Sequence, residues 1–344
     1  MAAILNAIKK KKTPAQITNI CLEVLPDITS GGTSDDAKRN AEERLLKRLN
    51  QMKAILYGEN GGEPNEVKAV ELSRALVAND ALVQLVMQLE ALPFEARKAV
   101  AAVFGGVVRR DAEGLLSTHL EGKPELVTHL VEGYARPESA LLCGQMLREA
   151  ARHPPLCALA LRPELLRRFM GEFVQEASFD VASDAFATLR DLLTRHKDVA
   201  AAFLTAHYAE VFGLYNDRLL TSENYVTRRQ SLKLLGELLL ERANFNVMMQ
   251  YISDKSNLKR VMIMMRDNSA NIQFEAFHVF KVFVANPRKP AEVEAILLNN
   301  RDKLVAFLEN FHNDKEDPQF IEEKQLLIAT LKGLGVEGGG AEGA

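Results

Sequence analysis

Three side chains near residue 230 could together hold a partner molecule: Tyr225, Arg229 and Lys233. They are spaced i, i+4 and i+8, so on a helix they lie along one line. An aromatic ring beside two cations can bind acidic groups through charge-assisted hydrogen bonds. On an isolated helix two cations at i and i+4 repel each other by about 0.2–0.5 kcal/mol, so exposing them has a cost. The line therefore indicates a binding surface, and the alternative is a solvated basic face in which Glu237 pairs with Lys233.

The segment that must position these side chains is Ser222–Arg242, which is predicted to be a helix. Its leucines form two stripes: Leu232, Leu235 and Leu239 make one, and Leu234 and Leu238 make the other. A helix that is apolar on two sides must lie between neighbouring elements. The segment is therefore expected to be an inner helix of a stacked array.

A second candidate surface follows directly after this helix. Cations and large apolar side chains are mixed there, namely Arg242, Phe245, Met248, Met249, Lys259, Arg260, Met262, Met265 and Arg266. Methionine is flexible and polarisable, which suits an adaptable apolar pocket. The alternative is that the methionines belong to the core and the cations to a solvated face.

Motifs for catalysis or metal binding do not occur in the chain. His153 and Cys157 are spaced i and i+4, but two prolines separate them and no second Cys/His pair completes a zinc site. There is no Walker-type phosphate loop, no nucleophile elbow and no calcium loop. We therefore expect a protein that is not an enzyme, needs no cofactor and binds no metal, calcium included.

The composition argues against several classes of partner. The 344-residue chain has a net charge of −3, 47% hydrophobic residues and no Trp. A chain without net positive charge is a poor match for nucleic acid. No apolar run reaches about 18 residues, so no membrane span is expected. The three cysteines are widely spaced, and the N-terminal Lys run follows the apolar residues instead of preceding them, so a cytoplasmic protein is expected.

A regular period runs through the chain. Five segments of helical pattern end at polar stops, which are Arg110, His153, His196, Arg242 and Asn286. The stops are 43, 43, 46 and 44 residues apart. Armadillo and HEAT units repeat every 40–47 residues or so, with two or three helices each. The chain is therefore predicted to be all-α, a right-handed α-solenoid of armadillo/HEAT-like repeats with a concave binding groove.

One helical-repeat domain is expected over residues 14–333. Shorter amphipathic segments, at 81–92, 201–215, 257–265 and 301–311, would supply the other helices of the repeats. Residues 1–13 are predicted to be a disordered basic arm in which the Lys run is solvated. Residues 334–344 are predicted to be a flexible tail, because this segment has too few apolar side chains to pack.

Three long segments resemble the calcium-binding-protein-39 family, also called the mouse-protein-twenty-five family. They are SFDVASDAFATLRDLLTRHK at 178–197, SENYVTRRQSLKLLGELLLERANF at 222–245 and RDNSANIQFEAFHVFKVFVANP at 266–287. The resemblance extends from about residue 14 to residue 333, whereas the segment 111–125 departs from it and is richer in Gly and acidic residues.

The resemblance implies a scaffold that binds and activates protein kinases. Partners in that family are kinases of the sterile-twenty (germinal-centre) group and STRAD-like pseudokinases, with a liver-kinase-type partner in a trimer. The alternative function is a general armadillo-type adaptor for a different protein, such as a member of the nuclear-Dbf-related kinase network or a cytoskeletal or trafficking protein.

The resemblance also implies two sets of contact residues. The kinase groove would use Phe179, Tyr225, Arg229 and Lys233. A hydrophobic pocket for a Trp-Glu-Phe-like segment of the partner would use Arg242, Phe245, Lys259 and Met262. For Phe179 the alternative is a place in the core, because it begins an apolar stripe that continues at residues 182, 186, 189 and 193.

Overall fold

The computed structural model describes residues 12–59, 62–111, 113–176 and 178–335. The chain divides into two compact units, Met1–Ala200 and Ala201–Ala344. Within the described ranges every regular element is a helix and no strand occurs. Most of the predicted basic arm (residues 1–13) and flexible tail (residues 334–344) lies outside these ranges, at residues 1–11 and 336–344.

The helices of the first unit cover its length almost without interruption. They are α2 (Pro14–Thr29), α3 (Asp35–Tyr57), α4 (Glu66–Ala78), α5 (Ala81–Met87), η1 (Leu89–Ala91), α6 (Phe94–Val108), α7 (Leu115–Glu121), α8 (Pro124–Glu132), η2 (Gly133–Ala135), α9 (Ala140–Ala150), α10 (Pro154–Ala160), α11 (Pro163–Gly171), η3 (Phe173–Gln175) and α12 (Phe179–Thr194). The boundary between the units lies inside α13 (Lys197–Ala206).

The second unit is built in the same way. Its helices are α14 (Tyr208–Leu214), the π-helical turn η4 (Tyr215–Leu219), α15 (Tyr225–Leu240), η5 (Arg242–Asn244), α16 (Phe245–Ser253), α17 (Lys255–Met264), α18 (Ala270–Ala285), α19 (Ala291–Asn299), α20 (Arg301–Glu309) and α21 (Pro318–Gly333).

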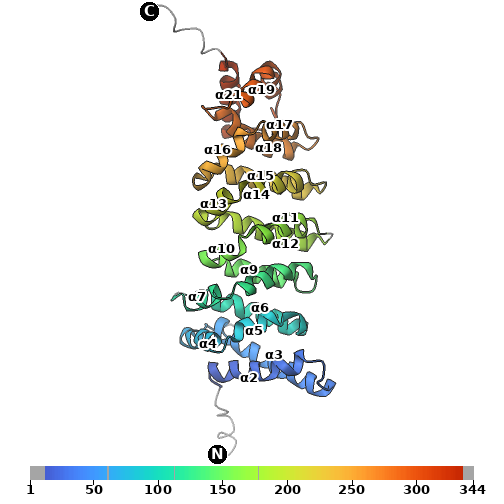
Figure 1. Cartoon of the computed structure of the whole chain (residues 1–344), viewed down its shortest axis with the longest axis vertical. Coiled ribbons are helices and arrows are strands. Elements are labelled where there is room, and N and C mark those ends of the chain that lie inside the picture. The colour runs from blue at the N-terminus through green and yellow to red at the C-terminus, as the bar shows by residue number, and fades with distance from the viewer. Residues whose placement is uncertain (1–11, 60–61, 112, 177, 336–344) are drawn as a thin grey trace, which may run out of the picture. The chain divides into compact units, whose positions relative to one another are not determined.

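Long helices pack on one another in chain order within each unit (Figure 1). In the first unit α3 contacts α6, α6 contacts α9, and α9 contacts α12. In the second unit α15 contacts α18, and α18 contacts α21. Shorter helices fill the intervals between them, as expected for units that bury an apolar face only against their neighbours. The prediction of an all-α, armadillo-like helical-repeat fold is confirmed.

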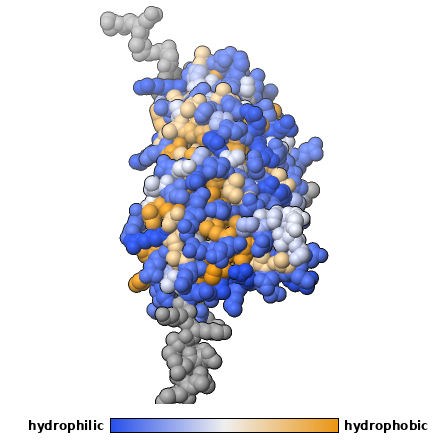
Figure 2. All heavy atoms as spheres, turned by 60° about the horizontal axis from the view of Figure 1, so that its bottom comes forward, coloured by the Kyte–Doolittle hydropathy of each residue, from blue (hydrophilic) through white to orange (hydrophobic). Residues whose placement is uncertain are grey.

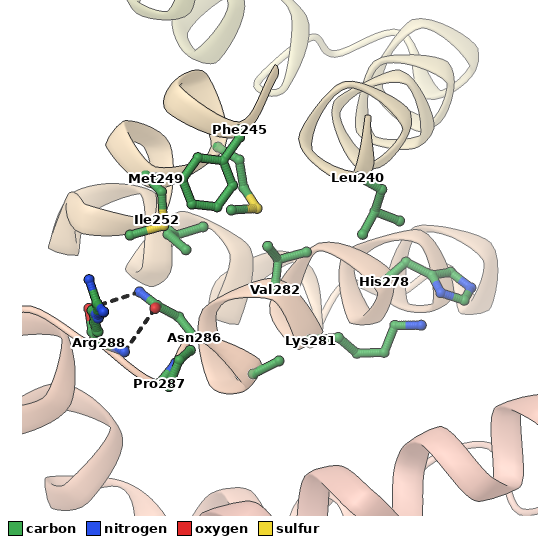
Figure 3. A pocket seen from close by; sticks show the side chains of 12 residues that line it. Leu240, Phe245, Met249, Ile252, His278, Lys281, Val282, Asn286, Pro287 and Arg288 are labelled. Carbon is green, nitrogen blue, oxygen red and sulfur yellow. Dashed lines mark hydrogen bonds between the residues drawn. The ribbon is translucent and has the colours of Figure 1, made fainter. Parts of the chain in front are cut away.

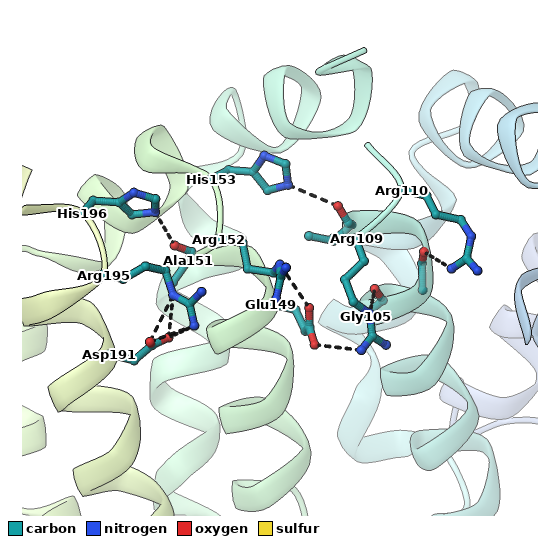
Figure 4. A network of polar contacts seen from close by, with 12 residues as sticks. Gly105, Arg109, Arg110, Glu149, Ala151, Arg152, His153, Asp191, Arg195 and His196 are labelled. Carbon is teal, nitrogen blue, oxygen red and sulfur yellow. Dashed lines mark hydrogen bonds and ion pairs between the residues drawn. The ribbon is translucent and has the colours of Figure 1, made fainter. Parts of the chain in front are cut away.

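Two histidines explain part of the sequence period. His153 Nε2 lies 3.2 Å from the carbonyl oxygen of Val108, and His196 Nε2 lies 2.8 Å from that of Ala151 (Figure 4). Each ring therefore bonds a carbonyl at the C-terminal end of the preceding long helix, where no intrahelical donor remains. These two stops of the sequence pattern thus each join one repeat to the repeat before it.

The surface is mixed in polarity. Figure 2, in which the N-terminal helices come forward, shows hydrophobic residues gathered in patches on a largely hydrophilic face. Exposed large apolar side chains of the first unit include Tyr57, Val67, Val70, Phe94, Leu115, Leu141 and Phe179. None of the helices in the described ranges has the length and apolar character that a membrane crossing requires.

Candidate protein-binding site

Helix α15 presents one polar line between two buried faces. Asn224 caps the helix, because its Oδ1 accepts hydrogen bonds from the backbone N–H groups of Val226 and Thr227. All five leucines of the two stripes, Leu232, Leu234, Leu235, Leu238 and Leu239, are buried. Tyr225, Arg229 and Lys233 are exposed. The predicted inner helix is therefore confirmed, and its aromatic–cation line lies on the exposed side of the helix.

A matching line on α18 faces these side chains. Asn271 Nδ2 donates to the Tyr225 hydroxyl at 3.0 Å, and Arg229 Nε lies 3.8 Å from Glu275 Oε1. Both pairs join residues 46 apart, so α15 and α18 run side by side in the same direction. On α18, residues 271, 275, 278, 282 and 285 share one helix face. The two lines together form one continuous surface.

The electrostatics of this surface favour negative charge near Tyr225. Hydrogen bonds from Ser269 and Asn271 lower the pKa of the Tyr225 phenol, because they stabilise its anionic form. Burial raises the pKa of Glu275, an effect that Arg229 and Lys233 partly oppose. The side chain of Glu275 is only 14% exposed, whereas both cations face solvent. The accessible charge of the line is therefore positive.

Phe179 lies at the start of α12 in the first unit. It is 64% exposed, while Phe186, two turns further along α12, is 8% exposed. The rest of the predicted apolar stripe, Ala182, Phe186, Leu189 and Leu193, is buried. The core interpretation of Phe179 is therefore wrong, and the residue is an exposed aromatic side chain at a helix N-terminus.

One apolar pocket lies between α16 and α18 in the second unit (Figure 3). Its volume is about 650 Å³. We call it the α16–α18 pocket; its lining residues are Leu240, Phe245, Met248, Met249, Ile252, His278, Lys281, Val282, Ala285, Asn286, Pro287 and Arg288. In Figure 3 Phe245 and Leu240 stand on one side of the pocket, and Val282 and Asn286 on the other.

A second apolar pocket lies between α17 and α20. Its volume is about 830 Å³, and we call it the α17–α20 pocket. The lining residues are Lys259, Met262, Ile263, Met265, Arg266, Ile296, Asn300, Lys303, Leu304, Ala306 and Phe307. Three of them are cations, and none of the described residues that line it is acidic. The pocket can hold an apolar group that carries a negative charge beside it.

The four residues assigned to a single peptide pocket are distributed over more than one place. Lys259 and Met262 lie together in the α17–α20 pocket. Phe245 lines the α16–α18 pocket. Arg242 lines neither pocket and is exposed in η5. Sequence spacing could not separate them, because the two pockets are formed by different sets of packed helices.

Several lining residues had not been singled out from the sequence. Leu240 lies outside both leucine stripes and on the same helix face as Lys233, which signals exposure at the end of α15. Lys303 and Phe307 are spaced i and i+4 on α20. Lys281 and Arg288 carry no local signal, because only the packing of α18 brings them to the α16–α18 pocket.

The chain shows no metal centre in the part that the structure describes. No group of three or more His, Cys, Asp or Glu side chains is placed to hold an ion there. His153 bonds the Val108 carbonyl, and the Cys157 thiol is buried 3.7 Å from the Leu192 carbonyl oxygen. Both residues therefore have structural roles.

Comparison with known proteins assigns the repeats to a family. A family model described as Mo25-like matches residues 5–335. The chain belongs to the Mo25-like family. The mouse protein named calcium-binding protein 39-like is 44% identical to this Mo25-like chain over 329 residues, covering 95% of the chain and 96% of the mouse protein.

Similar proteins occur in distant organisms. The MO25-like protein 2 of Caenorhabditis elegans is 45% identical over 333 residues, covering 95% of this Mo25-like chain and 98% of its own length. The Mo25-like protein of Schizosaccharomyces pombe is 40% identical over 329 residues, with 95% and 98% covered. Among solved structures, a designed armadillo repeat protein superposes with a TM-score of 0.42 at 12% identity, covering 76% of this chain and 98% of the designed protein.

Proposed function

We propose that this Mo25-like chain is a non-catalytic scaffold that binds and activates kinases of the sterile-twenty (germinal-centre) group or STRAD-like pseudokinases. The observation that carries the proposal is the exposed line of Tyr225, Arg229 and Lys233 on a helix whose other faces are buried. For the first unit the family resemblance implies Phe179 as a contact position, and its ring is exposed. The class of partner comes from the family resemblance. Three free, buried cysteines fit the reducing cytoplasm in which these kinases act.

Activation would work through a shift of populations. A surface that binds the closed, active kinase better than the open form raises the closed fraction by the ratio of the two affinities. A tenfold shift requires a preference of about 1.4 kcal/mol. Arg229 and Lys233 would supply charge-assisted contacts to carboxylates of the kinase.

The α17–α20 pocket is the place that we assign to a Trp-Glu-Phe-like segment of the partner. Met262, Ile263, Leu304 and Phe307 offer apolar contacts for the two aromatic rings. Lys259 stands among the cations that can meet the acidic residue. Simultaneous binding of kinase and segment raises the overall affinity through effective concentration, without any new contact.

The first experiment compares kinase stimulation by matched variants. A purified germinal-centre-group kinase is assayed with the wild type, with Arg229→Ala/Lys233→Ala and with Arg44→Ala/Lys47→Ala. The control variant removes two exposed cations from α3 and changes the net charge equally. Stimulation should fall at least about tenfold with the first variant, the equivalent of losing 1.4 kcal/mol, and stay unchanged with the second. Equal stimulation by all three proteins would exclude the groove assignment.

The second experiment tests the pocket with a fluorescent Trp-Glu-Phe peptide. Met262→Ala should weaken binding, because Met262 lines the α17–α20 pocket. Met249→Ala is the matched control, since Met249 lines the other pocket. If the wild type, Met262→Ala and Met249→Ala bind the peptide with equal affinity, the peptide does not bind in the α17–α20 pocket. A pull-down dominated by proteins other than kinases would favour the general adaptor function instead.

A further inference from the structure

Three arginines that follow neighbouring long helices of the first unit lie in one row (Figure 4). Arg109 follows α6, Arg152 follows α9 and Arg195 follows α12, and each is 43 residues from the next. Because α6 contacts α9 and α9 contacts α12, these equivalent positions are neighbours in space. Glu149 and Asp191 provide the carboxylates that pair with them, and we call the five residues the arginine row.

The two outer arginines are held in place by the protein itself. Arg109 Nε donates to the Gly105 carbonyl oxygen at 3.0 Å, and Arg109 Nη1 lies 3.3 Å from Glu149 Oε1. Arg195 Nε and Nη2 donate to the carboxylate of Asp191, at 3.0 and 2.8 Å. Side chains that are fixed beforehand lose little conformational entropy when a partner binds. The row is therefore preorganised at both of its ends.

The central arginine has the fewest contacts of the three. Arg152 Nε lies 3.9 Å from Glu149 Oε2, and no hydrogen bond holds the Arg152 guanidinium among the residues that the structure describes. Glu149 Oε2 is buried and likewise accepts no hydrogen bond from the described residues. A guanidinium presents paired N–H groups that match a carboxylate in a two-pronged geometry. Arg152 can therefore bind a carboxylate from outside the chain.

The accessible charge of the row is positive. The three guanidinium-bearing side chains are 33–49% exposed, whereas those of Glu149 and Asp191 are 17% and 20% exposed. Three positive charges meet two negative ones, so one positive charge is left over. Arg110, beside the row, pairs with Glu66 at 3.4 Å and adds no net charge. An anionic partner thus meets cations at the surface, with the carboxylates lying deeper.

From this arrangement we infer that the arginine row binds an extended acidic segment of a partner protein, with a carboxylate at every third residue. Helices packed side by side are about 8–10 Å apart, which sets the step from one arginine to the next. An extended chain advances about 3.3 Å per residue, so three residues span about 10 Å. Each carboxylate of the segment then meets one guanidinium.

The charge pattern selects carboxylates over phosphates. A phosphate group concentrates up to two negative charges at one point, and it would approach the carboxylates of Glu149 and Asp191 closely. Like charges at such distances repel, and one excess positive charge does not offset that repulsion. Single charges spread along an extended segment avoid it. A nucleic acid is disfavoured for the same reason, and also by the net charge of −3.

The row is separate from the residues assigned to kinase binding. Phe179 begins α12, whereas Arg195 follows the C-terminal end of this 16-residue helix. A helix of that length spans about 24 Å, at 1.5 Å per residue. In the second unit the residues before the stops of the pattern are Glu241 and Ala285, so the arginine pattern belongs to the first unit. Its test therefore does not need a kinase.

A peptide with the expected spacing tests the row directly. The peptide is rhodamine-Glu-Ser-Gly-Glu-Ser-Gly-Glu-amide, and fluorescence anisotropy measures its binding to the full chain at about 50 mM salt, where screening is weak. The control peptide, rhodamine-Glu-Glu-Glu-Ser-Gly-Ser-Gly-amide, has the same composition and charge but adjacent carboxylates. We expect the control peptide to bind about fivefold more weakly, because it loses at least one solvent-screened charge pair.

Variants of the central arginine identify the site. Arg152→Ala should weaken binding of the spaced peptide about fivefold. Arg152→Lys keeps the charge but loses the paired N–H groups, so it should weaken binding about twofold. Arg44→Ala is the matched control and should leave the affinity unchanged, because it removes one exposed cation from α3. The Arg152 side chain is half-exposed, so both of its variants keep the fold, which circular dichroism checks.

Four results would overturn the inference. The first is an equal affinity of Arg152→Ala and Arg44→Ala for the spaced peptide, and the second is an equal affinity of the wild type for the two peptides. The third is stronger competition by inorganic tripolyphosphate than by unlabelled spaced peptide, which would make the row a phosphate site. The fourth is loss of peptide binding in Arg229→Ala/Lys233→Ala, which would place the peptide on α15. Loss of kinase stimulation in that variant bears on the proposed function alone, so the two proposals can fail separately.

Discussion

Arg229 of α15 and Glu275 of α18 form an ion pair across the seam between two long helices, with 3.8 Å between Nε and Oε1. The carboxylate is largely buried and the guanidinium faces solvent. Lys233 adds a second cation, whose charge also acts on Glu275. The pair therefore ties the exposed cations to the underlying helix, so that the line of α15 is positioned by its neighbour.

Burial of Glu275 makes the stability of the protein depend on pH, and the pair with Arg229 partly opposes this effect. Burial raises the pKa of Glu275 above its ordinary value of 4.5, so the folded protein holds this proton more tightly than the unfolded chain does. Protonated Glu275 contributes stability that is fully present below the pKa of this residue in the unfolded chain. This contribution is lost as the pH rises through the higher pKa of Glu275 in the folded protein. Glu275→Gln cannot titrate, so we expect the wild type to lose stability relative to the variant as the pH increases.

Urea unfolding between about pH 4 and about pH 7 measures this difference, because the window begins near the ordinary glutamate pKa. Glu63→Gln is a control, since Glu63 is exposed in a loop. Parallel stability curves for the wild type and Glu275→Gln would show that Glu275 titrates as it does in water.

Truncation of two phenylalanines of α12 should change the stability of the protein by very different amounts. Phe186 is buried, so Phe186→Ala should destabilise the protein by about 3–5 kcal/mol through lost transfer energy and a cavity. Phe179 is exposed, so Phe179→Ala should stay within about 0.5 kcal/mol of the wild type. Chemical denaturation measures both effects. A large loss of stability in Phe179→Ala would contradict its place on the surface.

Gly144 on α9 is required by a polar network beneath α12. Tyr134 donates to Asp184 at 2.6 Å, and Arg148 binds both carboxylate oxygens of Asp184, at 2.7 and 2.9 Å. A Cβ at residue 144 would lie 2.1 Å from Asp184 Oδ2 and from the Tyr134 hydroxyl. Gly144→Ala should therefore break the network and cost about 2–4 kcal/mol.

The denaturation midpoint measures this cost against a second glycine. Gly171 ends α11, and a Cβ there would meet nothing within 4 Å. Gly171→Ala should be neutral or stabilising by up to about 1 kcal/mol, because alanine favours a helix. Similar midpoints for the two variants would mean that the network adapts to the extra methyl group.

The three cysteines should be unreactive in the folded protein. Burial raises the pKa of the Cys21, Cys143 and Cys157 thiols to about 12. At pH 8 only about one thiol in ten thousand is then a thiolate, which is the reactive form. Iodoacetamide at that pH should leave the native protein unmodified and alkylate all three residues in denaturant. Rapid modification of the native protein would show local opening around a thiol.

Much of the fold could be predicted from the sequence, because the signals for it are local. The two leucine stripes of α15 follow from helical geometry alone, and the 43-residue spacing of His153 and His196 marks equivalent helix ends. The interpretation of Phe179 as a core residue was wrong because of its position at the start of α12. A helical stripe shows which residues share a face, whereas Phe179 lies at the first turn, beyond the reach of the neighbours that cover Phe186.

The sequence by itself determined the all-α repeat class, the family and the exposed line of Tyr225, Arg229 and Lys233, because periodicity and long motifs depend only on residue order. Only the tertiary structure decided that Glu275 lies under this line, and that Phe245 and Met262 line different pockets. These contacts join residues on separate helices, and their partners depend on how the helices pack. Packing between helices is a property of the folded unit and has no period in the chain.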